Sequence, residues 1–468
     1  MNNNICKYKL LSPDSAGDSA DLVSGKTPEE GLRRIQALLA DWLRMENVVV
    51  LTAAGCSVGA GGRLMAGPKK NNLGHLVLDA VEQCSLSKDA RAIIEWKKQK
   101  GFEKGNFEEW LSYLFSAPEF SRDDNSPIDT VAWKKHDAPE NSPPLLLKEE
   151  DEQKLCGYIE KAIYAECALQ IDRGELSGDS SSNSSGHIPF LSKLVARDTN
   201  LGRTHLFTLN YDTLFEQALE ELGIQYFDGF SGKTTARFDP AVYGLDIYYP
   251  GDVAEGRVRR FDKFLQFYKL HGSIHWFVDE DGTYRAQHRD LSFAKDYRKS
   301  APTKKAEKLQ SDYKHIQSFG ILPTSGKFTQ TLEMPYAHLF RLFHVRLNQP
   351  QTFLMVLGYG FGDDHVNRII ETALMNPSLV MLVVEPNPDS VIVKRVSRYQ
   401  SLGQRAFVLT ERVEAGKECS YQVATFADFA QNVMPDVQWL EDFRKLRRFE
   451  EQIRKTEDTT SGESTGGA

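Results

Sequence analysis

Residues 48–59 read Val-Val-Val-Leu-Thr-Ala-Ala-Gly-Cys-Ser-Val-Gly, a short β-branched run that passes directly into glycines. A continuous apolar run of this length is typical of a strand that is buried on both faces of a parallel sheet. Three later segments also end an apolar run, at residues 208–212 (Thr-Leu-Asn-Tyr-Asp), 269–273 (Lys-Leu-His-Gly-Ser) and 357–363 (Leu-Gly-Tyr-Gly-Phe-Gly-Asp). Parallel strands end at one edge of their sheet, where ligands bind. The four segments therefore predict one site that handles a dinucleotide.

Strands and helices alternate over much of the chain. Apolar runs predict strands at residues 48–52, 205–209, 267–270, 352–357 and 380–384. Helix-period apolar positions predict helices at residues 213–222, 336–347, 364–374 and 389–399, and the capping box at residues 27–30 begins a helix before the first strand. This alternation predicts an α/β fold, a Rossmann-like doubly wound parallel sheet formed by residues 27–69 and 188–425.

The remaining segments have a different character. Residues 1–26 are rich in Ser, Asp and Gly and are expected to be a disordered N-terminal arm. Residues 70–187 predict a large helical insertion, which would act as a lid or as an assembly surface, and the charged residues 279–320 predict a second insertion. Residues 426–468 predict a C-terminal helix, over 426–455, followed by a disordered tail.

Composition excludes several classes of protein. The chain of 468 residues has a net charge of −8, with 57 Lys+Arg against 65 Asp+Glu, so direct binding of nucleic acid is not expected. No segment approaches the about 20 apolar residues that a membrane span needs. The six cysteines form no CxxC pair, which argues against a structural zinc site and a disulfide framework. With no secretory signal at the N-terminus, these observations predict a cytoplasmic protein.

The first glycine loop offers phosphate-binding chemistry. Glycine lets the backbone approach a pyrophosphate closely, and loop N–H groups supply positive potential. The segment is neither a GxGxxG motif nor a P-loop, because no Gly-Lys-Ser/Thr follows. Ala54, Gly55 and Ser57 are therefore candidate binding residues, and the alternative is a simple turn that ends the strand.

Two polar residues follow the strand at 205–209. Asn210 offers a donor and an acceptor for ribose hydroxyls or a bound water, and the alternative is a structural turn. Asp212 suits the N-cap of the next helix, but Thr213 and Glu216 can supply the capping box instead. We therefore expect the Asp212 carboxylate to be available for chemistry.

His271 ends the strand at 267–270 and precedes a glycine. A histidine at the carboxyl end of a parallel strand suits a general base, whereas a lone histidine is more often structural. His365 is the one other histidine adjacent to a motif, and we expect it to cap a helix. No metal site is expected from these residues.

The last glycine loop repeats the pattern of strand, glycines and helix. Gly358, Gly360 and Phe361 are candidate binding residues, and we expect Asp363 to serve mostly as a helix N-cap. Glu385 follows the strand at 380–384, where a carboxylate can accept ribose or adenine hydrogen bonds, or where the next proline simply begins a loop.

Taken together, these motifs resemble the sirtuin-like (silent information regulator) superfamily. Its members have a strand that runs into Gly-Ala-Gly-x-Ser, then Asn-x-Asp, then His-Gly, then a late glycine loop, in this order. Here the motifs stand at residues 54–57, 210–212, 271–272 and 358–363, and the resemblance covers roughly residues 45–60 and 190–400. The chain lacks the four-cysteine zinc module of histone-deacylase sirtuins, and it has Leu209 and Tyr211 where they have Gln and Ile.

Three features look like a bacterial branch of the superfamily. They are the Asn-Tyr-Asp form, the Gly-Tyr-Gly-Phe-Gly-Asp-x-His loop and the helical insertion, which has Asn-Phe-Glu-Glu-Trp-Leu at 106–111. Sirtuin-like domains of that branch are NAD-consuming effectors of anti-phage systems. The resemblance thus implies an NAD glycohydrolase with NAD as substrate. A protein deacylase and a non-catalytic NAD or ADP-ribose sensor are the alternatives.

The resemblance also implies roles for individual residues. His271 would act as the base, Asn210 would position water or ribose, and Asp212 would stabilise developing positive charge. Two loops would hold the pyrophosphate and ribose, one with Ala54, Gly55 and Ser57 and the other with Gly358, Gly360 and Phe361. Glu385 would bind the adenosine end. A toxic NADase must be restrained, so we expect a homo-oligomer or a partner such as a HerA-type ATPase, contacted through residues 70–187 or 426–455.

Overall fold

The computed structural model describes most of the chain, apart from its ends and several loops. The described residues are 5–13, 19–65, 72–100, 107, 110, 111, 114, 131–133, 145–171, 185–198, 200–249, 260–279, 282–287, 291–311, 334–414 and 416–436.

A large sheet forms the centre of the molecule. Within the described residues it has nine strands in the order β2-β1-β15-β14-β13-β3-β6-β10-β7. All neighbours from β15 to β7 pair in parallel, whereas β1 pairs antiparallel with both β15 and β2. The strands are β1 (Tyr8–Pro13), β2 (Ser19–Asp21), β3 (Asn47–Thr52), β6 (His205–Thr208), β7 (Gln225–Phe227), β10 (Phe264–Lys269), β13 (Thr352–Leu357), β14 (Val380–Val384) and β15 (Ala406–Glu411).

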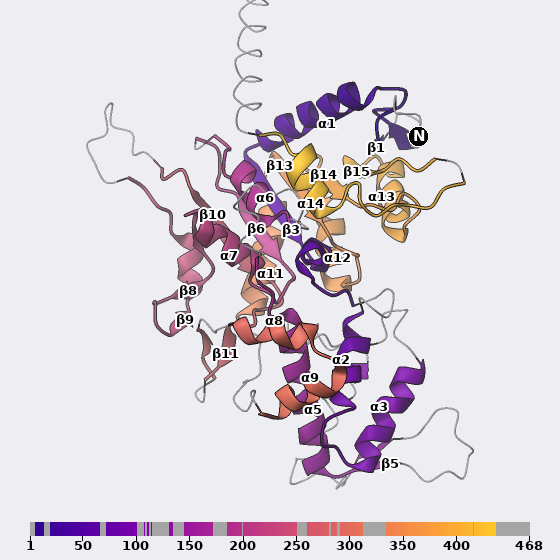
Figure 1. Ribbon diagram of the computed structural model, residues 1–468. Coiled ribbons are helices and arrows are strands. Elements are labelled where there is room, and N and C mark those ends of the chain that lie inside the picture. The colour runs from indigo at the N-terminus through magenta and orange to yellow at the C-terminus, as the bar shows by residue number, and fades with distance from the viewer. Residues whose placement is uncertain are drawn as a thin grey trace, which may run out of the picture.

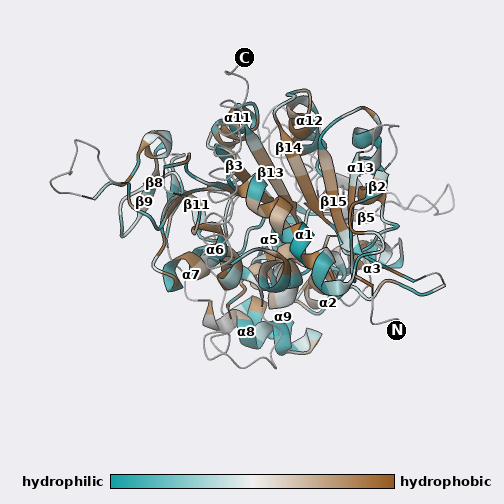
Figure 2. Ribbon diagram, turned by 90° about the horizontal axis from the view of Figure 1, so that it is seen from above, coloured by the Kyte–Doolittle hydropathy of each residue, from teal (hydrophilic) through white to brown (hydrophobic). Residues whose placement is uncertain are grey.

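Helices cover both faces of this sheet. One face packs against α1 (Pro28–Leu43), α6 (His187–Leu194) and α7 (Leu214–Glu221), and the other against α11 (Tyr336–Leu347), α12 (Asp364–Ala373) and α13 (Val391–Ser401). Figure 2 shows the hydrophobic strands β3, β13, β14 and β15 between these two sets of helices. Burial on both faces explains why the strands are apolar without alternation. The expected α/β fold with a doubly wound sheet is confirmed.

The order of the strands creates a topological switch point at β3. Its neighbours are β6 on one side and β13 on the other, and the chain reaches β13 only after the whole β6–β10 half is complete. Ligands of open α/β sheets bind outside the carboxyl ends of the strands at such a point. The loops that follow β3, β6 and β13 are therefore the expected walls of a site.

The N-terminal segment differs from the sequence-based expectation of a disordered arm. β1 and β2 complete the edge of the sheet, with Leu10 opposite Leu409 of β15. Every second residue of β1 is buried, and the hydroxyl of Tyr8 donates to both carboxylate oxygens of Asp428, at 3.1 and 3.0 Å. The sequence does not predict β1, because polar residues flank its short apolar run and its partner strand β15 lies almost 400 residues later in the chain.

The helical insertion forms a body of its own with a separate apolar core. It contains α2 (Leu73–Val81), α3 (Lys88–Lys100) and α5 (Glu149–Cys167), and α8 (Ser292–Lys299) and α9 (Pro302–Ser311) join it. Figure 1 shows these five helices grouped together below the sheet. The segment expected as a second insertion is therefore part of the first one in space, through buried Tyr297 and Leu309.

A buried ion pair ties α9 to α5. The Lys305 ammonium lies 2.5 Å from Glu166 Oε1, and the side chains of Lys305 and Glu166 are 7% and 0% exposed. Lysines cluster in the sequence at positions 299, 304, 305, 308 and 314, which predicts a solvated loop face. This prediction holds for exposed Lys299 and Lys304 but is wrong for buried Lys305. Lys314 lies outside the described residues.

Smaller elements complete the described fold. β8 (Phe230–Ser231), β9 (Ala236–Phe238), β11 (Trp276–Val278) and β12 (Tyr284–Ala286) form a second sheet, β4 (Val131–Trp133) pairs with β5 (Leu145–Leu147), and η4 (Pro240–Gly244) is a 3₁₀ helix. Of the expected C-terminal helix, α14 (Phe426–Asp428) and the π-helical turn η6 (Phe429–Val433) are seen. Residues 434–436 are not helical, so the expected helix is wrong there, and the residues after 436, which include the expected tail, lie outside the described residues. None of the described helices is long and apolar enough to cross a membrane.

We predict that Lys305→Ala destabilises the helical body. Glu166 stays buried in the variant, with Arg63 at 3.7 Å from its Oε2, and breaking a buried pair costs about 3–5 kcal/mol of unfolding free energy. Denaturant unfolding followed by tryptophan fluorescence measures the loss. Lys304→Ala, at an exposed position of the same helix, is the matched control and should change stability by less than about 0.5 kcal/mol. Equal effects of the two substitutions would contradict the role of the buried pair.

Candidate functional site

Two glycine loops meet where β3 and β13 end. After β3 the chain forms a short 3₁₀ helix, η1 (Ala54–Ala60), whose Gly55 N–H donates to the Gly358 carbonyl oxygen at 3.0 Å. A Cβ atom at Gly55 would lie 2.6 Å from the Cα of Gly358, and one at Gly358 would lie 2.5 Å from the Cys56 nitrogen. Gly358 also has a left-handed φ of 62°. Neither position accommodates a side chain, so the two loops hold each other at the switch point.

The other loop residues divide into open and packed positions. Ala54 begins η1 and is partly exposed, and a Cβ at Gly360 would meet open space. Phe361 is 6% exposed and packs against Tyr359, with ring centroids 4.8 Å apart. Ala54 and Gly360 therefore leave backbone accessible, whereas Phe361 supports the loop from inside.

Ser57, Asn210 and Asp212 form a buried polar cluster beside the glycine loops. The Ser57 hydroxyl donates to Asp212 Oδ2 at 2.6 Å. The Asn210 amide nitrogen donates to Ser57 Oγ at 2.9 Å and to the Ala53 carbonyl oxygen at 3.1 Å. All three predicted side chains are at least nine-tenths buried, so segments about 150 residues apart build one hydrogen-bonded unit.

Asp212 also caps α7, which corrects an expectation. Its Oδ1 accepts from the Leu214 N–H at 3.1 Å, whereas Thr213 makes no side-chain cap. The Thr213 hydroxyl accepts from the Gln217 amide instead, and Glu216 pairs with Lys269. The expected capping box of Thr213 and Glu216 is therefore wrong, because both side chains have partners elsewhere.

Lys269 is a site residue that the sequence analysis did not identify. It is the last residue of β10 and only 2% exposed, and its ammonium donates to the Asp212 carbonyl oxygen at 2.5 Å and to Glu216 Oε1 at 2.7 Å. A lysine that ends a fully buried strand two residues before His271 was the available signal. It places a buried cation against the Glu216 carboxylate, and its charge also acts on the Asp212 carboxyl group.

Burial sets the electrostatics of these carboxylates. Desolvation raises the pKa of Asp212, while the Lys269 charge and the hydrogen bonds from Ser57 and Leu214 act in the opposite direction. Desolvation likewise raises the pKa of Glu216 to about 7, with Lys269 again lowering it. A low-dielectric surrounding strengthens the interaction of Asp212 with any positive charge that develops nearby.

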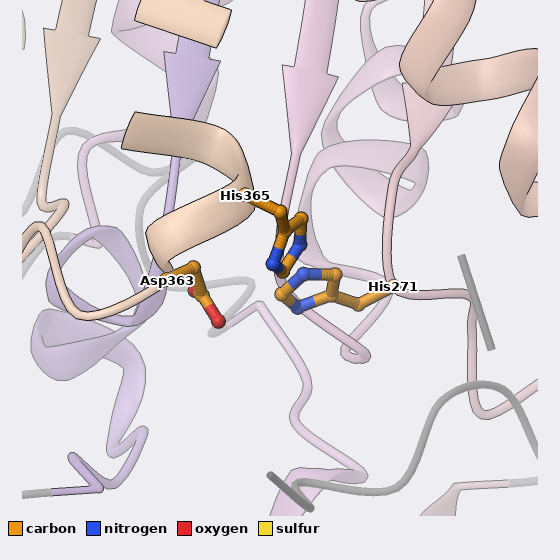
Figure 3. Close-up of side chains that lie close together, drawn as sticks. All are labelled: His271, Asp363 and His365. Atoms are coloured by element: carbon orange, nitrogen blue, oxygen red, sulfur yellow. The ribbon is translucent and has the colours of Figure 1, made fainter. Parts of the chain in front are cut away.

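His271 lies in a second cluster at the same edge of the sheet. Its side chain is 3% exposed, and its ring lies 6.5 Å from the ring of Tyr211, the residue between Asn210 and Asp212. Figure 3 shows the rings of His271 and His365 side by side, with the Asp363 carboxylate pointing toward them. The ring centroids of the two histidines are 5.8 Å apart. The structure thus places the Asn-Tyr-Asp segment next to the expected base.

Neither Asp363 nor His365 makes the capping contact expected of its side chain. Asp363 is at the N-cap of α12, as predicted, but its side chain makes no capping hydrogen bond. His365 sits in the first turn of α12 with its ring against Phe340, at 4.8 Å between centroids. His271, Asp363 and His365 each offer one ligand atom, and these atoms lie within 4.8 Å of one another. Among the described residues, this group could hold a metal ion.

Glu385 lies apart from these clusters. It follows β14, separated from β3 by β13, and its Oε1 accepts from the Asn387 N–H at 3.1 Å. Burial raises the pKa of its carboxyl group. The contact stabilises its own loop, and a role toward adenosine stays a prediction.

A cavity of about 700 Å³ opens on the far side of Glu216. Its wall includes Glu216, Ser273, His275 and Trp276, and none of the ten predicted site residues lines it. It adjoins the candidate site through the contacts that Lys269 makes with Glu216 and Asp212. Apart from Glu385, the predicted residues instead lie in or beside the loops that follow β3, β6, β10 and β13.

Comparison with known proteins supports the sirtuin-like superfamily. A family model described as "SIR2-like domain" matches residues 204–401, from just before β6 to the end of α13. The match includes Asn210, Asp212 and His271, whereas the first glycine loop precedes it. Domains of this family are in general NAD-dependent enzymes, so the match indicates a function related to NAD. No curated protein matches the chain.

We predict that Gly358→Ala destabilises the protein much more than Gly360→Ala. The first change forces a Cβ against the Cys56 nitrogen and a non-glycine residue into a left-handed conformation, which alone costs about 1–3 kcal/mol. The second adds a methyl group in open space two residues away. Thermal unfolding of both variants measures the difference, and similar melting temperatures would show that the two loops separate easily.

Proposed function

We propose that the protein is an NAD glycohydrolase that cleaves NAD to nicotinamide and ADP-ribose. The observation that carries this proposal is the buried Ser57–Asn210–Asp212 cluster at the switch point, adjacent through Tyr211 to His271. The match of residues 204–401 to a SIR2-like domain supports NAD as the substrate.

Asp212 suits the stabilisation of positive charge on the ribose. Cleavage at C1′ passes through an oxocarbenium-like transition state, as in glycoside hydrolysis. The Asp212 carboxylate is buried and oriented by Ser57 and by the Leu214 N–H. A fixed carboxylate in a low-dielectric site stabilises such charge without reorganising during the reaction.

Asn210 suits the positioning of ribose or water. Its amide nitrogen donates to Ser57 and to the Ala53 carbonyl, and these two donations use both amide hydrogens and fix the amide plane. The amide oxygen Oδ1 is therefore the atom that would accept a hydrogen bond from a ribose hydroxyl or from the attacking water.

His271 would act as the general base. A water molecule attacks C1′ while the C1′–N bond breaks, and the bonding electron pair returns to the nicotinamide ring, which leaves as a neutral molecule. The water proton passes to the His271 imidazole and then to solvent. The backbone around Ala54, Gly55, Gly358 and Gly360 would hold the pyrophosphate and ribose, with Phe361 supporting the loop and Glu385 toward the adenosine.

Two alternatives predict different products. A protein deacylase needs an acyl-lysine acceptor, whereas a sensor module binds NAD or ADP-ribose without turnover. The segment after His271 forms β11 and β12. All six cysteines are free thiols at scattered positions, so they do not form the four-cysteine module that supports the peptide groove of a deacylase. This favours the glycohydrolase.

In the cell, we propose a cytoplasmic effector of bacterial anti-phage defence. Unrestrained NAD hydrolysis would drain the cofactor of its own cell, so the resting protein would have low activity. The helical body, with α2, α3 and α5, and the segment after residue 426 are the surfaces proposed for self-assembly or for a partner such as a HerA-type ATPase.

We predict that the protein releases nicotinamide from NAD without any acylated peptide. His271→Ala and Asn210→Ala should each lower turnover by about 10²-fold or more while NAD binding is nearly retained. Chromatography of nicotinamide and ADP-ribose, with NAD affinity measured by calorimetry, tests this. The control is His344→Ala, an exposed histidine of α11, which should leave turnover unchanged.

Three outcomes would redirect the assignment. Turnover that requires acetylated peptide and yields O-acetyl-ADP-ribose would identify a deacylase. Binding of NAD with no turnover in any assembled state would identify a sensor. Unfolding of His271→Ala, with unchanged activity per folded molecule, would show that this histidine is structural.

We also predict that activity follows assembly. Light scattering alongside NAD hydrolysis should show a low-activity resting oligomer whose turnover rises when a partner rearranges it. A shift of about 1 Å at the site can change turnover about 10²-fold, so a small rearrangement suffices. A fully active monomer that responds to no partner would refute this prediction and leave the helical body as a lid or an appendage.

A further inference from the structure

The cluster of His271, Asp363 and His365 has the composition of a transition-metal site. Two imidazoles and a carboxylate each offer one ligand atom, and these atoms lie within 4.8 Å of one another. Imidazole nitrogen and carboxylate oxygen are ligands of zinc, and three protein ligands that leave a fourth position open are a known zinc arrangement. Figure 3 shows all three side chains directed toward a common point.

The elements that carry the three side chains hold them in place. His271 follows β10 directly, and its side chain is buried. Asp363 and His365 lie on either side of the first residue of α12, and the Asp363 carbonyl accepts from the Asn367 N–H at 3.0 Å and from the Tyr359 hydroxyl at 3.1 Å. The backbone that presents two of the ligands is thus hydrogen-bonded twice.

The distances require only a small closure. A tetrahedral ion with bonds of about 2.0–2.2 Å holds its ligand atoms about 3.3 Å apart, so the side chains need to approach by at most about 1.5 Å. Asp363 and His365 are partly exposed, and His271 is buried. Rotation of the Asp363 and His365 side chains can close the cluster around an ion.

We propose that His271, Asp363 and His365 bind a divalent first-row transition-metal ion, with Zn²⁺ as the best fit, and that the bound ion holds the site inactive. Coordination occupies an imidazole nitrogen of His271 and so prevents it from accepting a proton from water. The binding itself is independent of the proposed NAD hydrolysis, whereas the inhibition rests on it. The bound ion then prevents NAD hydrolysis until the ion is removed.

The binding test uses the full chain, stripped of metal by a chelator and kept reduced. Titration with Zn²⁺ by calorimetry should show one site per chain. Asp363→Asn, His365→Asn and His271→Asn should each weaken it by at least about 10-fold, because loss of even an outer-shell partner weakens metal sites by about 10–100-fold. His344→Asn, at an exposed histidine of α11, is the matched control and should bind as the parent chain does.

Co²⁺ distinguishes this cluster from the cysteines. Cobalt bound by nitrogen and oxygen gives visible ligand-field bands without the near-ultraviolet charge-transfer band of a cobalt thiolate. Absence of binding, a thiolate band at the stoichiometric site, or binding that survives all three cluster substitutions would each overturn the proposal.

The inhibition test is separate. Zn²⁺ at the concentration that fills the site should suppress nicotinamide release, and a chelator should restore it. Saturated binding with undiminished turnover would overturn the inhibitory role. A chain that binds Zn²⁺ through the cluster but never hydrolyses NAD would confirm the metal site and refute the proposed function, so the two failures are distinct.

Discussion

The close contact between Gly55 and Gly358 is the constraint on which the site depends. Two loops that follow neighbouring strands, β3 and β13, approach until backbone touches backbone, and a hydrogen bond of 3.0 Å joins them. On the other side of β3, its pairing with β6 brings Ser57 to Asp212, and Asp212 Oδ1 accepts from the Leu214 N–H at the start of α7. The contact between the two glycines therefore sets the position of the last loop against the first loop, and the first loop also carries Ser57 of the polar cluster.

Much of this arrangement follows from the sequence. Strands buried on both faces read as continuous apolar runs, which is why the core strands β13 and β14 have the predicted bounds. The clustering of Ser57, Asn210 and Asp212 follows from their places at the ends of parallel strands. Sequence periodicity indicates the burial of each strand well, because that burial is a local property of the strand.

The features that were missed depend on distant partners. β1 is a strand because β15 offers an open edge, and α8 and α9 bury their apolar residues against α2 and α5. Glu216 stands at the capping-box position after Thr213, but in the folded chain its carboxylate pairs with Lys269 of β10 instead. No local pattern reveals such competition, because the competing group is brought in by the fold.

The pairing of β1 with β15 has a consequence for the order of folding. The first strand of the chain finds its partner only when residues 406–411 have been synthesised, and the Tyr8–Asp428 hydrogen bonds span 420 positions. Contacts of such sequence separation form slowly. Until they form, β15 presents an unpaired edge that another chain can extend. A nascent or N-terminally shortened chain is therefore exposed to edge-to-edge aggregation, and the N-terminal strand serves as the protein's own protection against it.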